Sequence, residues 1–215
     1  MRLAVISDIH GNLDKLYSAG KLLGEADAIV VCGDISRHGD LKEIERVIKE
    51  LKEINNKLFA IPGNMDGEQS IKILEDLKVN IHGKKTEFEN YFFIGCGGST
   101  KTPFGTPFEL DEDLIYSCIK EKIEEPKKTV IVCHTPPHKT KTDRTIFGMH
   151  VGSRKLKNLI EETKPLCFLC GHIHESANVD FVENTLILNP GPFRRGGIGV
   201  VEINGEEIKG RIERV

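Results

Sequence analysis

The chain has 215 residues, of which 39% are hydrophobic and 29% are charged, and this composition is typical of a soluble globular protein. Its 30 basic and 33 acidic residues give a net charge of −3. The chain therefore lacks the overall basic excess of proteins that coat DNA or RNA, although a local basic patch is compatible with this charge. We expect one domain over residues 1–215, with one large core and no strong nucleic-acid interaction.

The first half of the chain alternates short apolar runs with amphipathic stretches. In chain order, the predicted elements are a strand at Leu3–Ile6, a helix at Asn12–Leu23, a strand at Ala28–Cys32, a helix at Asp40–Leu51, a strand at Lys57–Ile61 and a helix at Gln69–Leu77. This order is typical of a parallel sheet that is flanked by helices.

The second half is richer in strands. Two helices are predicted, at Leu110–Glu124 and Ser153–Glu162, and Asn204-Gly205 predicts a hairpin turn. The predicted strands are Phe88, Tyr91–Cys96, Thr129–Cys133, Leu166–Cys170, Asn178–Phe181, Leu186–Asn189, Gly199–Ile203 and Ile208–Ile212. Two polar connections, Gly97–Glu109 and Thr135–Met149, are long enough to be functional or mobile.

The beginning of the chain does not resemble a targeting segment. The apolar run Leu3–Ile6 is too short for a signal-peptide core, and Asp8 follows at once. No apolar run approaches the roughly 20 residues that a membrane-spanning helix needs. These observations predict a cytoplasmic protein without a membrane partner.

The six cysteines are interpreted as core thiols. A chain of 215 residues without a leader argues against a disulfide framework. Cys167 and Cys170 form a CxxC pair, but they lie inside a strand-like run without turn residues. Because positions three apart in a strand face opposite sides, their sulfurs cannot hold one metal ion together.

Five predicted strands end in polar side chains of the kind that bind metals. These clusters are Ser7–His10, Gly33-Asp34, Gly63–Asp66, His134 and Gly171–His174. Ligands bind at the carboxyl ends of strands in α/β sheets, so we expect the five clusters to converge. Each cluster alone is a weak signal. The complete set is hard to explain as packing, since a buried unpaired carboxylate or imidazole costs several kcal/mol.

The residue types indicate which metals would bind. Imidazole, carboxylate and amide ligands without a thiolate suit Mn²⁺, Fe or Zn²⁺ rather than a structural zinc site built from cysteines. Two such ions together can activate water and neutralise the charge that develops on a phosphoryl group.

The ordered motifs resemble the signature of the calcineurin-like metallophosphoesterase family. The matching segments are Asp8-x-His10, Gly33-Asp34, Gly63-Asn64, His134 and Gly171-His172-x-His174. Asn189-Pro190-Gly191 is also similar to this family. Shorter segments, among them Gly97–Thr100 and Gly148–Ser153, resemble a small prokaryotic subgroup that has Gly-Asn-Met-Asp in place of Gly-Asn-His-Asp/Glu.

The resemblance implies an α/β fold, a four-layer α/β/β/α sandwich, and a dinuclear metal centre. Asp8, His10 and His174 would hold one metal ion, Asn64, His134 and His172 would hold the second, and Asp34 would bridge both. The ions would be divalent, Mn²⁺ first, with Fe, Ni²⁺ or Zn²⁺ as alternatives. A bridging hydroxide would attack phosphorus directly, with Asp34, Asn64 and His134 as catalytic residues. The implied partner is a small phosphoester substrate, and a homodimer is left open.

The chain departs from the family pattern at Met65, where many members carry a histidine that protonates the leaving group. A thioether cannot donate a proton, and the loss of a general acid costs about 10²–10⁴ in rate. The loss is greatest for a basic alkoxide leaving group. We therefore expect phosphodiesters and aryl esters to be better substrates than alkyl monoesters.

The connection that follows His134 supplies three candidates for substrate binding, Arg144, His150 and His138. Arg144 could pair with a phosphate oxygen, and the two histidines lie close in sequence to His134. The alternative is a solvated loop with a few capping contacts. His38 and His82 match no motif and are interpreted as surface residues.

Two other functions are compatible with parts of this pattern. The first is a non-catalytic binding or scaffold protein on the same fold, and the second is an unrelated mononuclear hydrolase. All seven ligand positions carry competent residues, which argues against a scaffold with a degraded site. A mononuclear site leaves Asn64 or the second histidine cluster unexplained.

Overall fold

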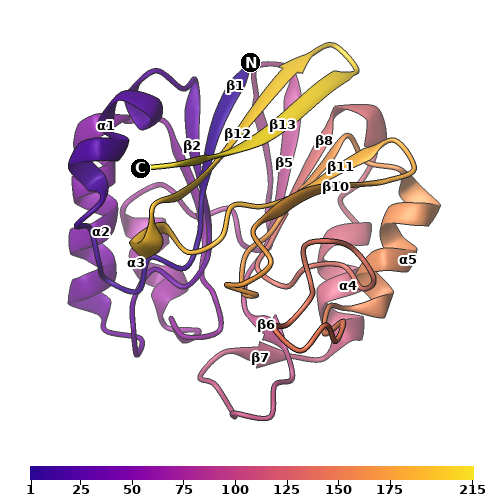
Figure 1. Cartoon of the computed structure of the whole chain (residues 1–215), viewed down its shortest axis with the longest axis horizontal. Helices are drawn as coiled ribbons and strands as arrows, with labels where there is room; N and C mark the ends of the chain where they lie inside the picture. Colours follow the sequence, from indigo (N-terminus) through magenta and orange to yellow (C-terminus); the bar gives the residue numbers. More distant parts are fainter.

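Two β-sheets packed face to face form the centre of the molecule, and the computed structural model describes residues 1–215 (Figure 1). The first sheet has the order β13-β12-β1-β2-β3. Its strands are β1 (Arg2–Ile6), β2 (Ala28–Cys32), β3 (Leu58–Ile61), β12 (Gly197–Asn204) and β13 (Glu207–Arg214). The strands β1, β2 and β3 are parallel, whereas β12 runs antiparallel to β1, with Leu3 opposite Val201.

The second sheet has the order β10-β11-β9-β8-β5-β4. Its strands are β4 (Lys85–Phe88), β5 (Tyr91–Cys96), β8 (Thr129–Cys133), β9 (Cys167–Leu169), β10 (Asn178–Val182) and β11 (Thr185–Asn189). The four central strands β5, β8, β9 and β11 are parallel, and the two edge strands are antiparallel to their neighbours.

Five α-helices cover the outer faces of the two sheets (Figure 1). The helices are α1 (Leu16–Gly24), α2 (Leu41–Ile54), α3 (Ser70–Asp76), α4 (Glu112–Lys120) and α5 (Arg154–Thr163). The first three pack against the first sheet, and α4 and α5 pack against the second. The predicted α/β/β/α sandwich is therefore confirmed. The structure contains no helix that is both long and apolar enough to span a bilayer.

Three separate hydrophobic cores lie between the four layers, and strand alternation assigns residues to them. On β1, Leu3 and Val5 face the core between the sheets, whereas Ala4 and Ile6 face the core under α1, α2 and α3. The amphipathic face of α2 supplies four of the buried residues in that outer core, Ile44, Val47, Ile48 and Leu51.

All six cysteines are free. Cys167 belongs to the core between the sheets, and Cys170 belongs to the core under α4 and α5. The two sulfurs therefore face opposite sides of the second sheet, which confirms that this CxxC pair is part of the core packing.

Two helices begin later than predicted, because other local structure replaces their first turns. α1 begins at Leu16 rather than Asn12, since Asn12 Oδ1 accepts from Asp14 N at 2.9 Å and forms a local turn instead. α4 begins at Glu112, since Leu110 belongs to the short strand β7 (Glu109–Leu110), which pairs with β6 (Ser99–Thr100). Asp40 and Ser153 are the N-caps of α2 and α5, and the side chain of each accepts a hydrogen bond from a backbone N–H of the first turn.

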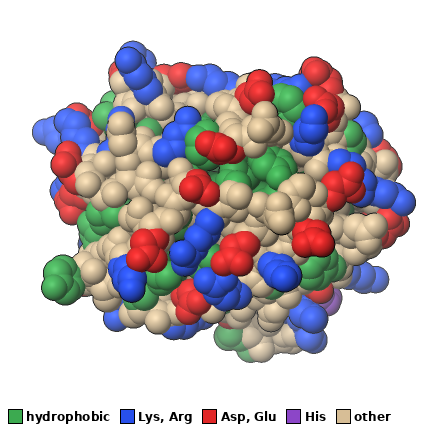
Figure 2. Space-filling view, turned by 90° about the horizontal axis from the view of Figure 1, so that it is seen from above, with side chains coloured by type: hydrophobic (Ala, Val, Ile, Leu, Met, Phe, Trp, Pro, Cys, Tyr) green, Lys and Arg blue, Asp and Glu red, His purple; other side chains and the backbone are tan.

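Charged residues are mixed over the end of the molecule that lies opposite the carboxyl ends of the parallel strands. Figure 2 shows this face, on which basic and acidic side chains alternate without a broad area of one sign. This distribution agrees with the net charge and offers no basic track for nucleic acid on that face.

Candidate metal centre

The polar clusters that follow the parallel strands meet at the lower edge of both sheets (Figure 1). Asp8 and His10 follow β1, Asp34 follows β2 and Asn64 follows β3. From the second sheet, His134 follows β8, and His172 and His174 follow β9. The structure thus brings all seven predicted ligand residues into one cluster, because both sheets place their carboxyl ends at the same edge.

The first group of potential ligand atoms comes from Asp8, His10 and His174, and these atoms lie within 4.8 Å of one another. His174 Nε2 lies 3.2 Å from Asp8 Oδ1 and 3.3 Å from His10 Nε2. Burial lowers the pKa of His10. A neutral imidazole keeps a lone pair available, and this is the form of histidine that binds a metal ion.

The second group comes from Asp8, Asp34 and His134, which are all buried. His134 Nδ1 donates to the carbonyl of Cys32 at 2.6 Å, so Nε2 of the neutral ring carries the lone pair. That atom faces Asn64 Oδ1 at 3.0 Å and Asp34 Oδ1 at 3.4 Å. Electron-rich atoms that face one another at these distances require a proton or a cation between them.

Buried negative charge makes this cluster favourable for cations. Burial of the His134 ring opposes its protonation, yet the charge of Asp34 raises the pKa of His134 to about 9. Burial likewise opposes ionisation of Asp8, but the hydrogen bond from His174 and the charge of His134 hold its pKa below the ordinary value. The donor set therefore fits divalent metal ions, which satisfy carboxylates and imidazoles together.

His172 joins the two groups. Its backbone N–H donates to Asp8 Oδ2 at 3.2 Å, and its ring lies edge-on to the ring of His134, with centroids 5.0 Å apart. Burial, with a further contribution from the charge of His134, lowers the pKa of His172 to about 4, so this ring is also neutral.

Four of these residues hold an unusual backbone conformation. The φ angles of Asp8, His10, Asp34 and His172 are 54°, 48°, 52° and 70°, in the left-handed region that residues other than glycine rarely occupy. Each such residue costs roughly 1–3 kcal/mol, a cost typical of functional sites. The surrounding structure holds the chain in sharp turns that direct these side chains inward, which no sequence pattern reveals.

Two glycines make the close approach of these turns feasible. A Cβ atom on Gly63 would lie 2.1 Å from Asp34 Oδ1, and one on Gly171 would lie 1.8 Å from Ser7 Oγ. These separations are far below van der Waals contact. The glycines that precede Asn64 and His172 are therefore needed for space rather than only for turn formation.

Comparison with known proteins agrees with this geometry. The sequence model of the calcineurin-like phosphoesterase family matches residues 1–176 of this chain. The chain belongs to this family. It is 39% identical over 199 residues to the uncharacterized protein MJ1162 of Methanocaldococcus jannaschii, with 89% of this chain and 88% of that protein covered. The family resemblance that the sequence motifs indicated is thereby confirmed.

Two more distant proteins are similar over most of the chain. A probable cyclic nucleotide phosphodiesterase of Coxiella burnetii is 23% identical over 198 residues, covering 84% of this chain and 79% of that protein. The crystal structure of TT1561 from Thermus thermophilus has a TM-score of 0.77 at 18% identity, with 98% and 97% of the two chains covered. The structural similarity shows the same fold.

A second layer of hydrogen bonds positions the ligand residues of this family member. Asp66, fully buried, accepts from the backbone N–H groups of Ile35, Ser36 and Gly63 at 2.7–3.0 Å. Burial and the charge of Asp34 raise the pKa of Asp66 to about 6. Asp66 thereby connects the turn that carries Asp34 with the turn that carries Asn64.

Asn189 has a similar role in the second sheet. Its amide nitrogen donates to the carbonyls of Gly171 and Ile173 at 3.2 and 3.0 Å, and its Oδ1 accepts from Gly191 N at 2.8 Å. The segment Asn189-Pro190-Gly191 therefore holds the turn that carries His172 and His174.

An open cleft of about 620 Å³ lies over the cluster. Three of its charged or titratable lining residues are not ligand candidates: Arg37, His38 and Arg194. Arg194 Nη2 approaches His174 Nδ1 at 3.5 Å, and Arg37 Nε donates to the carbonyl of His10 at 3.1 Å. Sequence reasoning missed both arginines, because neither belongs to a motif and only the fold brings them to the cleft.

The three predicted substrate-binding residues do not line this cleft. His150 Nδ1 lies 2.6 Å from Asp143 Oδ1, and His138 Nδ1 lies 3.6 Å from Asp143 Oδ2. Arg144 lines a separate cavity beside Lys141. Closeness in sequence to His134 was a poor guide, since the buried carboxylate of Asp143 holds His150, and His138 Nδ1 is buried without a hydrogen-bond partner. Their part in substrate binding stays a prediction.

Two further histidines were interpreted as surface residues. His38 is exposed, as expected, but it stands at the mouth of the cleft. His82 is half-buried, and its Nδ1 accepts from Gly97 N at 2.7 Å, so that interpretation is wrong for His82. Its ring supports the start of the Gly97–Glu109 connection.

Proposed function

We propose that this protein is a metal-dependent phosphoester hydrolase with a dinuclear centre, and that it prefers phosphodiesters to alkyl monoesters. One observation carries the proposal. The Nε2 atom of His134, fixed by the hydrogen bond of Nδ1 to Cys32, faces the oxygens of Asn64 and Asp34 in a buried cluster. These groups need a proton or a cation between them, and a divalent ion would satisfy the imidazole, the carboxylate and the amide oxygen together.

The residues that would hold the metals divide as the family resemblance implies. Asp8, His10 and His174 would hold one ion, Asn64, His134 and His172 the other, and Asp34 both. When bound, two divalent ions supply a nucleophile at neutral pH and neutralise charge on the phosphoryl group. The lowered pKa values of His10 and His172 keep both rings in the neutral form that binding needs, whereas His134 would lose its proton to solvent when a metal ion binds.

The cleft supplies groups that would bind and orient the ester. Arg194 and Arg37 place two guanidinium groups at its wall, where they can pair with phosphoryl oxygens. The amide of Asn64 lies at the floor and is oriented by His134. The backbone N–H of Met65 donates to Asp34 Oδ1 at 2.9 Å. The backbone at position 65 therefore positions that carboxylate independently of the Met65 side chain.

The preference for diesters follows from Met65, whose side chain also lines the cleft. The thioether cannot protonate a leaving alkoxide, so esters with acidic leaving groups should react best. We expect metal-loaded protein to hydrolyse bis-p-nitrophenyl phosphate at least about tenfold faster than an alkyl monoester such as ethyl phosphate, as measured by kcat/KM with Mn²⁺. A clear preference for the alkyl monoester would contradict the Met65 argument and leave the hydrolase proposal intact.

A histidine at position 65 should restore a proton donor. We expect Met65→His to raise turnover of alkyl monoesters by about 10–100-fold, and to change turnover of bis-p-nitrophenyl phosphate by less than about threefold. Met65→Gln is the matched control, since it is similar in size and cannot act as an acid. Equal gains with both variants, or none with histidine, would contradict the role assigned to this position.

A non-catalytic scaffold on the same fold is the second candidate function. The complete ligand set argues against it, since a scaffold needs no seven converging side chains. Metal stoichiometry separates the two proposals directly. Protein that binds no Mn²⁺, Ni²⁺ or Zn²⁺ in elemental analysis would favour the scaffold, whereas two ions per chain would favour the hydrolase.

A further inference from the structure

A second cavity beside the metal cluster has an unusual lining. Five large apolar side chains with substantial exposure come together there, from two loops that are far apart in the sequence. They are Phe104, Ile146, Phe147, Met149 and Val151. Phe104, Ile146 and Phe147 are 84%, 75% and 82% exposed. Apolar side chains gathered in this way mark a binding surface, because water contact disfavours each of them.

This cavity is continuous with the metal cluster. It has a volume of about 490 Å³, within the range typical of small-molecule sites. Asn64, His172 and His174 line both the cavity and the cleft over the cluster. An ester whose phosphoryl group lies at the cluster would therefore extend its substituent into this cavity.

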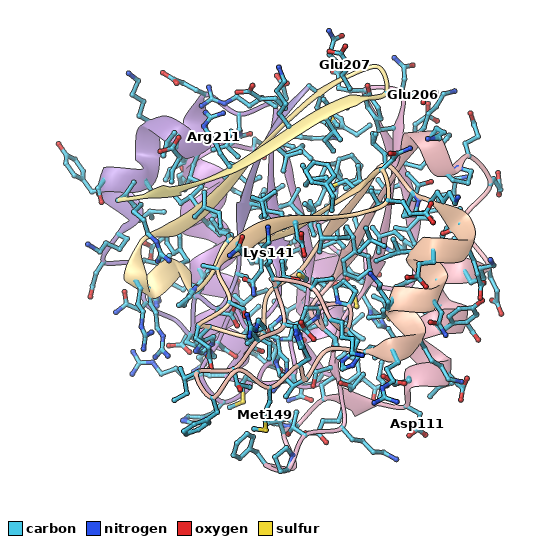
Figure 3. All side chains as sticks on the ribbon, turned by 45° about the vertical axis from the view of Figure 1, so that its right-hand side comes forward. Asp111, Lys141, Met149, Glu206, Glu207 and Arg211 are labelled. Carbon is cyan, nitrogen blue, oxygen red and sulfur yellow. The ribbon has the colours of Figure 1, made fainter.

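The wall that carries four of the apolar residues is a well-formed hairpin. Thr145 N donates to the carbonyl of Met149 at 2.9 Å, and Val151 N donates to the carbonyl of Asp143 at 3.1 Å. Ile146 N donates to Glu175 Oε1 at 3.1 Å, next to the ligand residue His174. Figure 3 places Met149 at the lower end of the molecule, beyond the edge of both sheets.

Asp143 fixes the base of that hairpin. Its carboxylate is fully buried, and it accepts from Thr140 N and Gly152 N at 3.0 Å and pairs with His150 Nδ1 at 2.6 Å. Ile146, Phe147 and Met149 therefore lie at the end of a hairpin whose base is fixed by hydrogen bonds. Such a fixed base reduces the conformational entropy that is lost when a ligand binds.

The two charged side chains of the cavity that are not ligand candidates already have polar contacts within the protein. The charged residues of its lining other than the two ligand histidines are Lys101 and Glu175. Lys101 Nζ lies 2.6 Å from Asp111 Oδ1, and Glu175 accepts from Ile146 N. With these charges engaged, the cavity favours an apolar group over a charged one.

We propose that this cavity binds an apolar substituent of the phosphoester, an alkyl chain or aryl group, next to a phosphoryl group held at the metal cluster. The inference rests on the proposed function for the position of the phosphoryl group. It adds the substrate class, an ester that joins phosphate to a hydrophobic alcohol, and it assigns Ile146 and Phe147 as determinants of specificity.

The test measures binding of alkylphosphonates, which carry the charge but contain no ester bond to hydrolyse. Titration calorimetry on the metal-loaded protein compares methylphosphonate with octylphosphonate. Each buried methylene should strengthen binding about two- to fourfold, so octylphosphonate should bind at least about 30-fold more tightly. Ile146→Ser/Phe147→Ser should reduce this ratio to below about threefold and leave methylphosphonate binding unchanged.

Phe181→Ser is the matched control, because Phe181 is an exposed phenylalanine on β10 that does not line the cavity. It should keep the wild-type ratio. Equal affinity for the two phosphonates, or no binding of either, would overturn the inference. A dimer that becomes a monomer in the double variant, without an effect on the ratio, would also overturn it and make the hairpin a contact between copies.

The outcomes separate this inference from the proposed function. Binding that depends on chain length, without hydrolysis of any ester, would support the cavity assignment and contradict the hydrolase. Metal-dependent hydrolysis of bis-p-nitrophenyl phosphate without any dependence of phosphonate binding on chain length would support the hydrolase and contradict the cavity assignment.

Discussion

Asp34→Asn should remove metal-dependent hydrolysis of bis-p-nitrophenyl phosphate, with kcat/KM reduced by at least about 10³-fold. The carboxylate of Asp34 lies 3.4 Å from His134 Nε2 and 3.7 Å from His10 Nε2, between the two groups of potential ligands. The amide has nearly the same shape and can still accept the hydrogen bond from Met65 N. The loss therefore reports the missing negative charge rather than a change of fold.

Elemental analysis should show that this variant loads fewer than two metal ions per chain, while its circular dichroism spectrum matches that of the wild type. Asp113→Asn, on the exposed surface of α4, is the control for a charge change alone. If Asp34→Asn bound two ions and kept its activity, the bridging role assigned to Asp34 would be wrong.

Asp66→Ala should lower the free energy of unfolding by about 3–5 kcal/mol. The substitution leaves the buried N–H groups of Ile35, Ser36 and Gly63 without an acceptor. Each unsatisfied buried donor costs about 1–3 kcal/mol, so the effect should exceed that of an ordinary surface substitution several times over. The loss is structural and should appear without metal.

Urea denaturation in EDTA measures this effect without a contribution from metal binding. Asp66→Asn keeps one acceptor oxygen and should lie between the wild type and Asp66→Ala. A loss below about 1 kcal/mol for Asp66→Ala would show that the turns carrying Asp34 and Asn64 are held by other contacts.

The layers of the fold and the composition of the cluster could be predicted because they depend on local patterns. Side chains along β1 point alternately to the two faces of the sheet, which assigns them to two different cores. Apolar residues at helical spacing along α2 identify the face of that helix that is buried. Polar residues directly after β1, β2, β3, β8 and β9 converge because parallel strands place their carboxyl ends at one edge. The order of the motifs was therefore enough to predict which side chains meet.

Other parts of the site could not be predicted, because they depend on contacts between distant segments. Arg194 reaches the cluster through a turn whose direction no spacing encodes, and Phe104 and Phe147 line one cavity although they come from segments far apart in the sequence. Arg144 and His150 were expected at the substrate site, but the buried carboxylate of Asp143 sets the course of that loop. Irregular backbone lacks the periodicity on which such predictions rest.

The antiparallel pairing of β1 with β12 joins residues separated by almost the whole sequence. Met1 N donates to the carbonyl of Ile203 at 2.8 Å, and Ile203 N donates back to the carbonyl of Met1 at 2.8 Å. During synthesis, one hydrogen-bonding edge of β1 therefore stays unpaired until Gly197–Asn204 has left the ribosome. The region that matches the family model ends at residue 176, before this strand. Residues 1–176 therefore lack the strand that completes the first sheet, and pairing of such long range is expected to slow folding, because the ends of the chain must meet first.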